Sequence, residues 1–229
     1  MRRRPSSPPP VPFSPQAARA HRAGLGLTPE QVAEAMAAHG VRLLPAHVAA
    51  WEAGELRPSE EEFVALSRAL WCPPAQLMGV RPATLRDFRL SRELTREQAA
   101  RRIGVSVQTY ARAEDTGHWD ADEEQSLALA HALGLTLRAL VHVTGRQDEL
   151  ELLLRQVVDG RWQARLRAVA RLVPVPDPVL GGVLADLQDE YLVPAHWGSA
   201  VPDAARPPAR PLADRFWELL SRPGTDVPV

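Results

Sequence analysis

The chain has 229 residues, of which 45% are hydrophobic and 24% charged, and its formal net charge is -1, a balance typical of a soluble globular protein with one to three domains. Its single cysteine excludes an internal disulfide framework and a four-cysteine zinc site, and favours a reducing, cytoplasmic compartment. No run approaches the roughly 18 consecutive apolar residues that span a bilayer, so we expect no contact with membranes.

Residues 1–13 combine arginine and proline without an apolar segment, which predicts a disordered arm and not a signal peptide. Residues 14–80, the first repeat, and residues 81–145, the second repeat, each carry signals for five short helices. Residues 146–229, the C-terminal module, show longer amphipathic stripes and a proline-rich stretch before a last helix. Alternating strand patterns are nearly absent, so we predict an all-α fold.

The two repeats share their helix boundaries. Thr28 precedes Gln31 as Thr95 precedes Gln98, which is the spacing of a capping box at the start of a helix. Glycine follows each of these helices, at Gly40 and Gly104, where a left-handed residue is needed. The same box spacing predicts that later helices start at Ser59 with Glu62 and at Asp120 with Glu123.

The run Leu94–Glu114 resembles the Cro/XRE, or phage-repressor, helix-turn-helix family without a gap. The first repeat resembles it more loosely, because the interval from Thr28 to Glu52 is five residues longer than that from Thr95 to Glu114. The resemblance implies two tandem five-helix helix-turn-helix domains followed by a C-terminal helical module. It also implies a sequence-specific transcription regulator, such as a repressor, that binds double-stranded DNA and is typically a homodimer.

In this family the second helix of the motif enters the major groove, where each base pair has a distinct hydrogen-bonding edge. The family's DNA-contacting positions correspond in the second repeat to Arg96, Val107, Gln108 and Arg112. Ser106 and Thr109 add hydroxyls beside them, and Arg102 adds a charge for phosphates. The resemblance thus places the reader of DNA sequence in the second repeat.

The equivalent positions of the first repeat are Pro29, Pro45, Ala46 and Ala50, whose side chains form no hydrogen bonds. We therefore expect this repeat to keep the fold without direct base contacts. The family also pairs an arginine of the first helix with the glutamate that ends the recognition helix. This implies two structural ion pairs, Arg22 with Glu52 and Arg89 with Glu114.

Charge is distributed unevenly along the chain. Residues 81–112 contain eight arginines and three acids, whereas residues 14–80 contain five arginines and seven acids. A local excess of positive charge is what binding to phosphates requires. The distribution agrees with DNA binding by the second repeat alone.

The C-terminal module matches no family that we recognise, and dimerisation, sensing of a small ligand and binding of a protein partner all remain open. The chain lacks metalloprotease, phosphate-loop, nucleophile-elbow and dinucleotide motifs, so we expect no enzymatic activity and no cofactor. Asp186, Asp189 and Glu190 with His196 form the one acidic cluster beside a histidine, and we expect no metal there.

Two classes of function follow from these patterns. The first is a bacterial cytoplasmic regulator that is associated with the nucleoid when bound to DNA. The alternative is a protein-interaction adaptor or antitoxin-like regulator that uses the helix-turn-helix folds to bind a partner.

Overall fold

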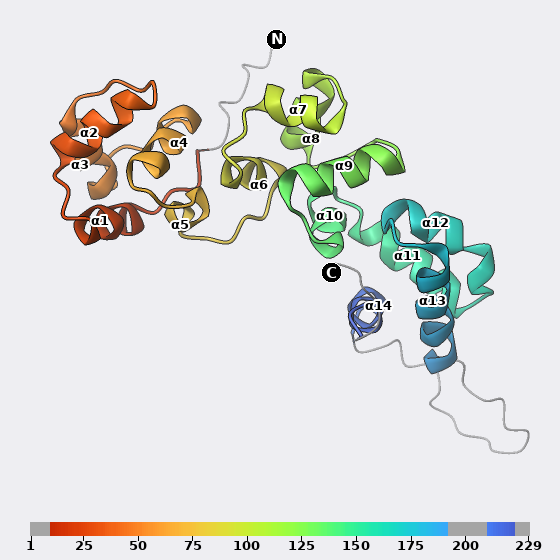
Figure 1. The fold of residues 1–229 in the computed structure, drawn as a ribbon. Coiled ribbons are helices and arrows are strands. Elements are labelled where there is room, and N and C mark those ends of the chain that lie inside the picture. Colours follow the sequence, from red (N-terminus) through yellow and green to blue (C-terminus); the bar gives the residue numbers. More distant parts are fainter. Residues whose placement is uncertain (1–9, 192–209, 223–229) are drawn as a thin grey trace, which may run out of the picture. The chain divides into compact units, whose positions relative to one another are not determined.

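The computed structural model describes residues 10–191 and 210–222, which form helices and no strands, and this confirms the all-α prediction (Figure 1). The chain divides into two compact units, Met1–Ala99 and Ala100–Val229. We call them the N-terminal and C-terminal units and describe each separately. The boundary falls inside a helix of the second repeat, and the predicted division at residues 14–80, 81–145 and 146–229 stays a prediction.

The N-terminal unit is built from six complete helices and the start of a seventh. These are α1 (Pro15–Gly24), α2 (Pro29–Ala38), α3 (Pro45–Ala53), α4 (Glu60–Ala69), α5 (Pro74–Met78), α6 (Leu85–Ser91) and the first residues of α7 (Arg96–Ile103). Its core is continuous from the first described residues to α6, and Trp51, Phe63 and Met36 are among its most buried side chains.

Capping side chains explain where these helices begin. The hydroxyl of Thr28 accepts a hydrogen bond from the backbone N–H of Gln31, while the Gln31 side chain accepts one from the Thr28 N–H. Ser59 and Glu62 form the same reciprocal box before α4. Each box satisfies backbone donors that a helix start otherwise leaves unpaired. Both boxes were predicted from the sequence and are confirmed.

Two residues assigned to the predicted arm belong to the core instead. Val11 and Phe13 are 3% and 6% exposed, and the Phe13 ring meets that of Phe63 edge to face at a centroid distance of 6.5 Å. Burial of these apolar side chains outweighs the entropy of ordering a short proline-containing segment. The part of the arm prediction that covers residues 10–13 is therefore wrong, and residues 1–9 lie outside the described residues.

The C-terminal unit completes α7 and adds the remaining elements. They are α8 (Val107–Thr116), α9 (Glu123–Leu133), α10 (Leu137–Val143), α11 (Gln147–Val158), the 3-10 turn η1 (Trp162–Ala164), α12 (Leu166–Leu172), α13 (Asp177–Tyr191) and α14 (Leu212–Leu220). Leu137 and Val141 of α10 share one hydrophobic core with α11 to α14. The last helix of the second repeat is thus also the first layer of the C-terminal module's core.

The start of α9 corrects a prediction. Asp122, not Asp120, is its N-cap, and its carboxylate accepts from the N–H of Gln125 at 2.8 Å. The chain is held at this position because Trp119 is buried and its indole N–H donates to the hydroxyl of Ser126 in α9. Asp120 and Asp122 both have the local sequence of an N-cap, and the buried position of Trp119 determines which of them caps α9.

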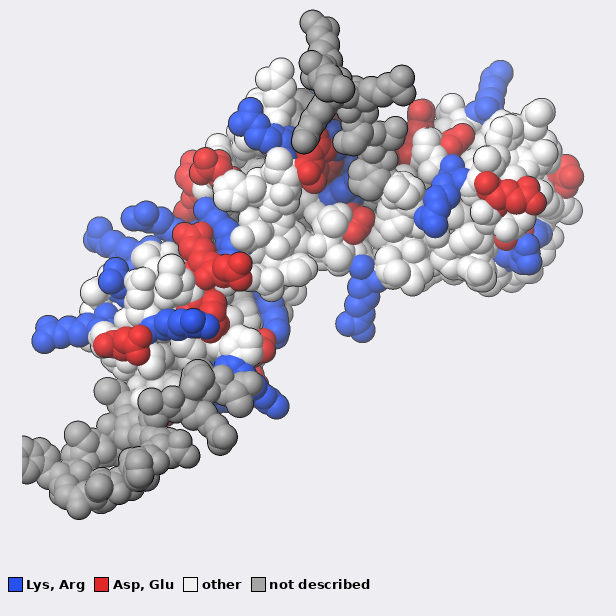
Figure 2. Space-filling model, turned by 180° about the vertical axis from the view of Figure 1, so that it is seen from behind, with Lys and Arg blue, Asp and Glu red and all other residues white. Residues whose placement is uncertain are grey.

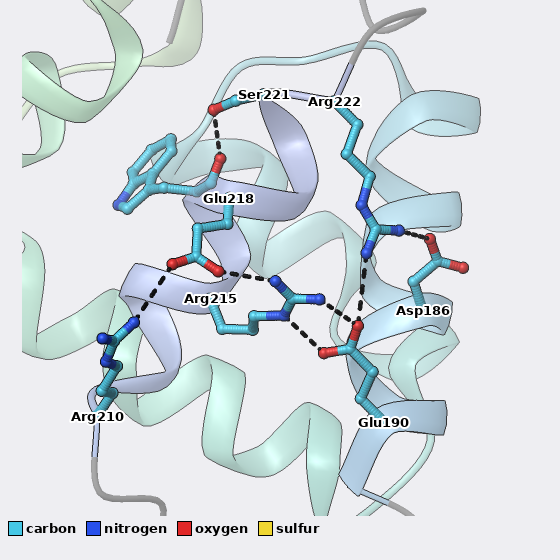
Figure 3. A network of polar contacts seen from close by, with 8 residues as sticks. Asp186, Glu190, Arg210, Arg215, Glu218, Ser221 and Arg222 are labelled. Carbon is cyan, nitrogen blue, oxygen red and sulfur yellow. Dashed lines mark hydrogen bonds and ion pairs between the residues drawn. The ribbon is translucent and has the colours of Figure 1, made fainter.

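Helix α14 packs back onto its own module. Phe216 and Leu220 are fully buried, and both carboxylate oxygens of Glu151 in α11 accept from the backbone N–H groups of Leu212 and Ala213. On its other side, Arg215 donates to Glu190 of α13 and to Glu218 (Figure 3). Glu151 therefore caps α14 from outside, and charged pairs surround the apolar contact.

No single helix in the described ranges is long and apolar enough to cross a membrane. Two consecutive helix pairs, α9 with α10 and α12 with α13, pass that test together on length and composition only, and they are bent by 107° and 111°.

Candidate nucleic-acid interface

Helix α8 starts from a tight three-residue turn, 104–106. Gly104 adopts a positive φ of 79°, which glycine tolerates without the steric cost that a side chain would add. Ser106 then caps the helix, because its hydroxyl accepts from the N–H of Thr109 at 3.0 Å. The hydroxyls of Ser106 and Thr109 also lie 2.8 Å apart, so these two predicted DNA contacts pair with each other in the free protein.

The faces of α8 are divided between core and surface. Tyr110 and Ala113 are 0% and 3% exposed and hold the helix against its unit. Gln108 and Arg112 are exposed and lie one turn apart on the opposite face. Val107 is 40% exposed at the first helical position. Three side chains predicted to contact bases therefore lie at the surface of a helix that is fixed from behind.

Predicted phosphate contacts flank this helix in sequence. Arg101 and Arg102, near the end of α7, are both exposed. Arg96 begins α7 and is half-buried. Glu97 lies in the same first turn, where hydrogen bonds with its own backbone N–H and with Thr95 lower the pKa of its carboxyl. The start of α7 thus carries mixed charge, while its end is purely basic.

This arrangement can do three things chemically. The amide of Gln108 can donate and accept together, the guanidinium of Arg112 can donate two parallel hydrogen bonds, and Val107 can contact a methyl group. These match adenine, guanine and thymine edges in the major groove. These groups supply hydrogen-bond donors, an acceptor and an apolar contact, which suits binding of a base edge.

Helix α3 occupies the corresponding place in the first repeat but has a different surface. Its N-cap, Leu44, provides no side-chain hydrogen bond, and Ala46 is exposed where the second repeat has Gln108. His47 contacts only the carbonyl of Leu44, at 3.3 Å, among the described residues. The structure thus supports the expectation that this helix lacks groups for direct base contacts.

The five extra residues of the first repeat are divided between helix and turn. Helix α2 has 10 residues where α7 has 8, which accounts for two. The α2–α3 connection covers residues 39–44, against 104–106 for α7–α8, which accounts for three. Both recognition-type helices then reach their glutamate seven positions after their first residue. The insertion lengthens the turn without changing α3.

The N-terminal unit contains the ion pair that the family resemblance implies between Arg22 and Glu52. Arg22 donates through Nε and Nη2 to the two carboxylate oxygens at 2.6 and 2.8 Å, and through Nη1 to the carbonyl of Leu27. Glu52 is buried, and hydrogen bonding to it raises the pKa of Arg22 above its ordinary value. The pair ties α1 to α3.

The corresponding residue Arg89 has a partner that the sequence did not indicate. Arg89 is 1% exposed and donates to Glu60 of α4 at 2.8 Å, and Arg86 donates to the other oxygen of Glu60 at 2.6 Å. Burial raises the pKa of Glu60, but the charges and hydrogen bonds of Arg89 and Arg86 outweigh it and leave the pKa below its usual value. The pairing of Arg89 with Glu114 stays a prediction.

Glu60 changes the charge count that favoured DNA binding. Two of the eight arginines between residues 81 and 112, Arg86 and Arg89, share its carboxylate, whose single negative charge offsets one of their two positive charges. On the face shown in Figure 2, arginines and acids lie interspersed over both units. The exposed arginines of this segment are Arg81, Arg92, Arg101, Arg102 and Arg112, and the last three belong to the end of α7 and to α8.

Among the described residues, no group of three or more His, Cys, Asp or Glu side chains is arranged so that it could hold a metal ion. Asp186 and Glu190 of the predicted acidic cluster pair with Arg222 and Arg215, while His196 lies outside the described residues. Burial raises the pKa of Cys72 to about 11, so its thiol stays protonated near neutral pH.

Comparison with known proteins agrees with this geometry. Residues 83–143, which span α6 to α10, match the family model of a helix-turn-helix domain. No curated protein and no solved structure matches the chain. The match identifies residues 83–143 as a helix-turn-helix domain and supports DNA binding by this part of the chain.

Proposed function

We propose that this protein is a sequence-specific transcription regulator of the tandem Cro/XRE type, with α8 as the helix that enters the major groove. The observation that carries the proposal is the exposed pair Gln108 and Arg112, one turn apart on a helix that is buried on its other side and lies within a helix-turn-helix domain. The same position in the first repeat exposes alanine, so only one of the two repeats offers base-reading groups.

Each side chain has a defined role in this proposal. Gln108 pairs with the adenine edge and Arg112 with the guanine edge, and each good bidentate contact discriminates by about 1–3 kcal/mol. Val107 contacts a thymine methyl. On binding, Thr109 and Ser106 exchange their mutual hydrogen bond for phosphate oxygens, beside Arg102.

The test begins by selecting duplexes that the full-length protein enriches from a random pool. Gln108→Ala and Arg112→Ala should each weaken binding to the selected site by about 5- to 150-fold, which corresponds to 1–3 kcal/mol. Gln76→Ala removes an exposed glutamine from α5 and serves as the matched control. Unaltered circular dichroism establishes that each variant folds.

Two results would contradict the proposal. One is the absence of any enriched sequence at low ionic strength. The other is that both folded α8 variants bind the selected site as tightly as the parent protein.

Assembly and regulation are further parts of the proposal. We expect a cytoplasmic homodimer that represses transcription and has no enzymatic activity, with the C-terminal module supplying dimer contacts or binding a ligand or partner. The length of the protected DNA tests the assembly, because two readers in a dimer engage half-sites about 34–36 Å apart. A footprint limited to one half-site, together with a monomeric mass, would oppose the dimer.

The surface of α3 supports a second candidate, a protein-interaction adaptor or antitoxin-like regulator. Leu44 and Leu56 on either side of α3 are 67% and 49% exposed, and Ala46, Ala49 and Ala53 are exposed between them. An apolar surface of this kind suits a protein partner better than bases. Salt-dependent DNA binding that survives Leu44→Ser but is lost in Arg112→Ala would favour the regulator over the adaptor.

A further inference from the structure

A second basic segment lies in the C-terminal module, far along the chain from α8. Residues 160–176 contain four arginines and no acid, and all four are exposed. We call them the α12 basic surface; its members are Arg161, Arg165, Arg167 and Arg171. Several arginine side chains project around α12 at the left edge of Figure 2.

These arginines differ from the other described arginines between residues 138 and 222. Every other arginine that the structure describes between residues 138 and 222 forms an ion pair with an aspartate or glutamate. Figure 3 shows three of them, Arg210, Arg215 and Arg222, sharing acids of α13 and α14. None of the four arginines of the α12 basic surface has such a partner among the described residues. Their charge is therefore available to an external anion.

Packing fixes the segment that carries them. Val169 and Leu172 of α12 are 0% and 3% exposed and belong to the module's core. The ring of Trp162 in η1 lies on Gly181 of α13, so closely that a β-carbon at Gly181 would be 3.2 Å from it. Gln188 donates hydrogen bonds to the carbonyls of Val157 and Gly160 and closes the preceding turn. The segment is held from one side and open on the other.

The four charges lie within eleven consecutive residues, 161–171, on this support. Arg167 and Arg171 are four positions apart on the face of α12 opposite Val169, a spacing that brings side chains together on a helix surface. Arg161 and Arg165 flank the three residues of η1. Guanidinium groups without acids among them can bind phosphate oxygens in pairs of parallel hydrogen bonds.

We propose that the α12 basic surface binds the phosphate backbone of duplex DNA without regard to sequence, and so adds affinity to the readout by α8. The inference rests on the proposed function, because a chain that binds DNA through α8 brings the phosphate backbone within reach of its other basic residues. It assigns the C-terminal module a contact with DNA besides any dimer or partner contact.

The test measures the salt dependence of binding by the full-length protein and by a variant in which all four arginines become glutamine. Each phosphate contact contributes about −0.9 to the slope of log K against log salt, so the variant's slope should be flatter by about 3 to 4. The parent's affinity loss between 50 and 200 mM salt should then exceed the variant's by about 10²-fold. The variant should lose the same factor on selected and on scrambled duplexes.

Arg222→Gln is the matched control, because Arg222 is also exposed but pairs with Asp186. It should leave the slope unchanged. Gln108→Ala provides the opposite pattern, with weaker binding of the selected duplex at an unchanged slope. Exposed substitutions of this kind change folding stability little, and circular dichroism verifies the fold.

Four outcomes would overturn the inference. A parent that binds no duplex at low salt defeats the proposed function and this inference together. A parent that binds, with a variant whose slope changes by less than about 1, defeats only the inference. Loss confined to the selected sequence, or a defect in binding phosphatidylserine vesicles with DNA binding intact, would show a base reader or a lipid surface instead.

Discussion

Replacing Glu52 with alanine should destabilise the N-terminal unit by about 3 kcal/mol. The Glu52 side chain is 6% exposed and receives two short hydrogen bonds from Arg22, which itself is 19% exposed. Breaking a buried pair costs about 3–5 kcal/mol, because the remaining charge has lost its partner but is still kept away from water. Arg22 keeps its bond to the carbonyl of Leu27 and partial access to water, which places the cost at the lower end.

Urea unfolding of the full chain, followed by far-ultraviolet circular dichroism, measures this loss. Glu34→Ala, an exposed acid of α2, is the control and should change stability by no more than about 0.5 kcal/mol. A double-mutant cycle with Arg22→Ala should show a coupling of at least about 1 kcal/mol. A loss below about 1 kcal/mol for Glu52→Ala, the value of an exposed surface pair, would refute the reasoning.

Three other substitutions test the remaining contacts. Glu60→Gln should lower the free energy of unfolding by about 1 kcal/mol near neutral pH, since Glu60 is partly exposed. Because the pKa of Glu60 is depressed in the folded protein, the difference in stability from the parent should vanish as pH falls through that pKa, and a difference that persists at low pH would contradict this. Gly79→Ala should lower the free energy of unfolding by about 2 kcal/mol, because φ is +70° and the new β-carbon would lie 2.6 Å from that of Ser14. Gly40→Ala, at φ +88°, meets nothing within 4 Å and should lower it by less, and equal losses would show that the clash with Ser14 contributes nothing. Glu151→Ala should remove the cap of α14 and speed amide hydrogen exchange in residues 212–220 by about tenfold, corresponding to 1–2 kcal/mol. Unchanged exchange would show that the apolar contacts of α14 are enough to hold the helix in place.

Local signals in the sequence were enough to predict most helix starts. Thr28 and Ser59 cap their helices because the partner groups are three residues away and independent of the rest of the fold. The cap of α9 failed for the opposite reason. Asp120 and Asp122 are both acceptable caps, and the choice depends on where Trp119 is buried, which only the folded core determines.

In the candidate interface, too, local features could be predicted from the sequence and contacts between distant residues could not. Exposure of Gln108 and Arg112 follows from the helical period and the buried positions of Tyr110 and Ala113. Glu60 could not be foreseen, because it lies 29 residues before Arg89 and meets it only through the packing of α4 and α6. The excess of arginine in the sequence was real, but tertiary contacts remove part of it.

Fold and function therefore depend on different positions of the two repeats. Caps, glycines and buried residues determine the helical frame, and α3 and α8 share that frame despite the longer turn before α3. The exposed positions contribute little to folding stability, so the frame accepts Ala46 as readily as Gln108. A helical frame of this kind accepts different exposed side chains, so the proposal that α8 reads DNA has to be argued from Gln108 and Arg112 and not from the frame.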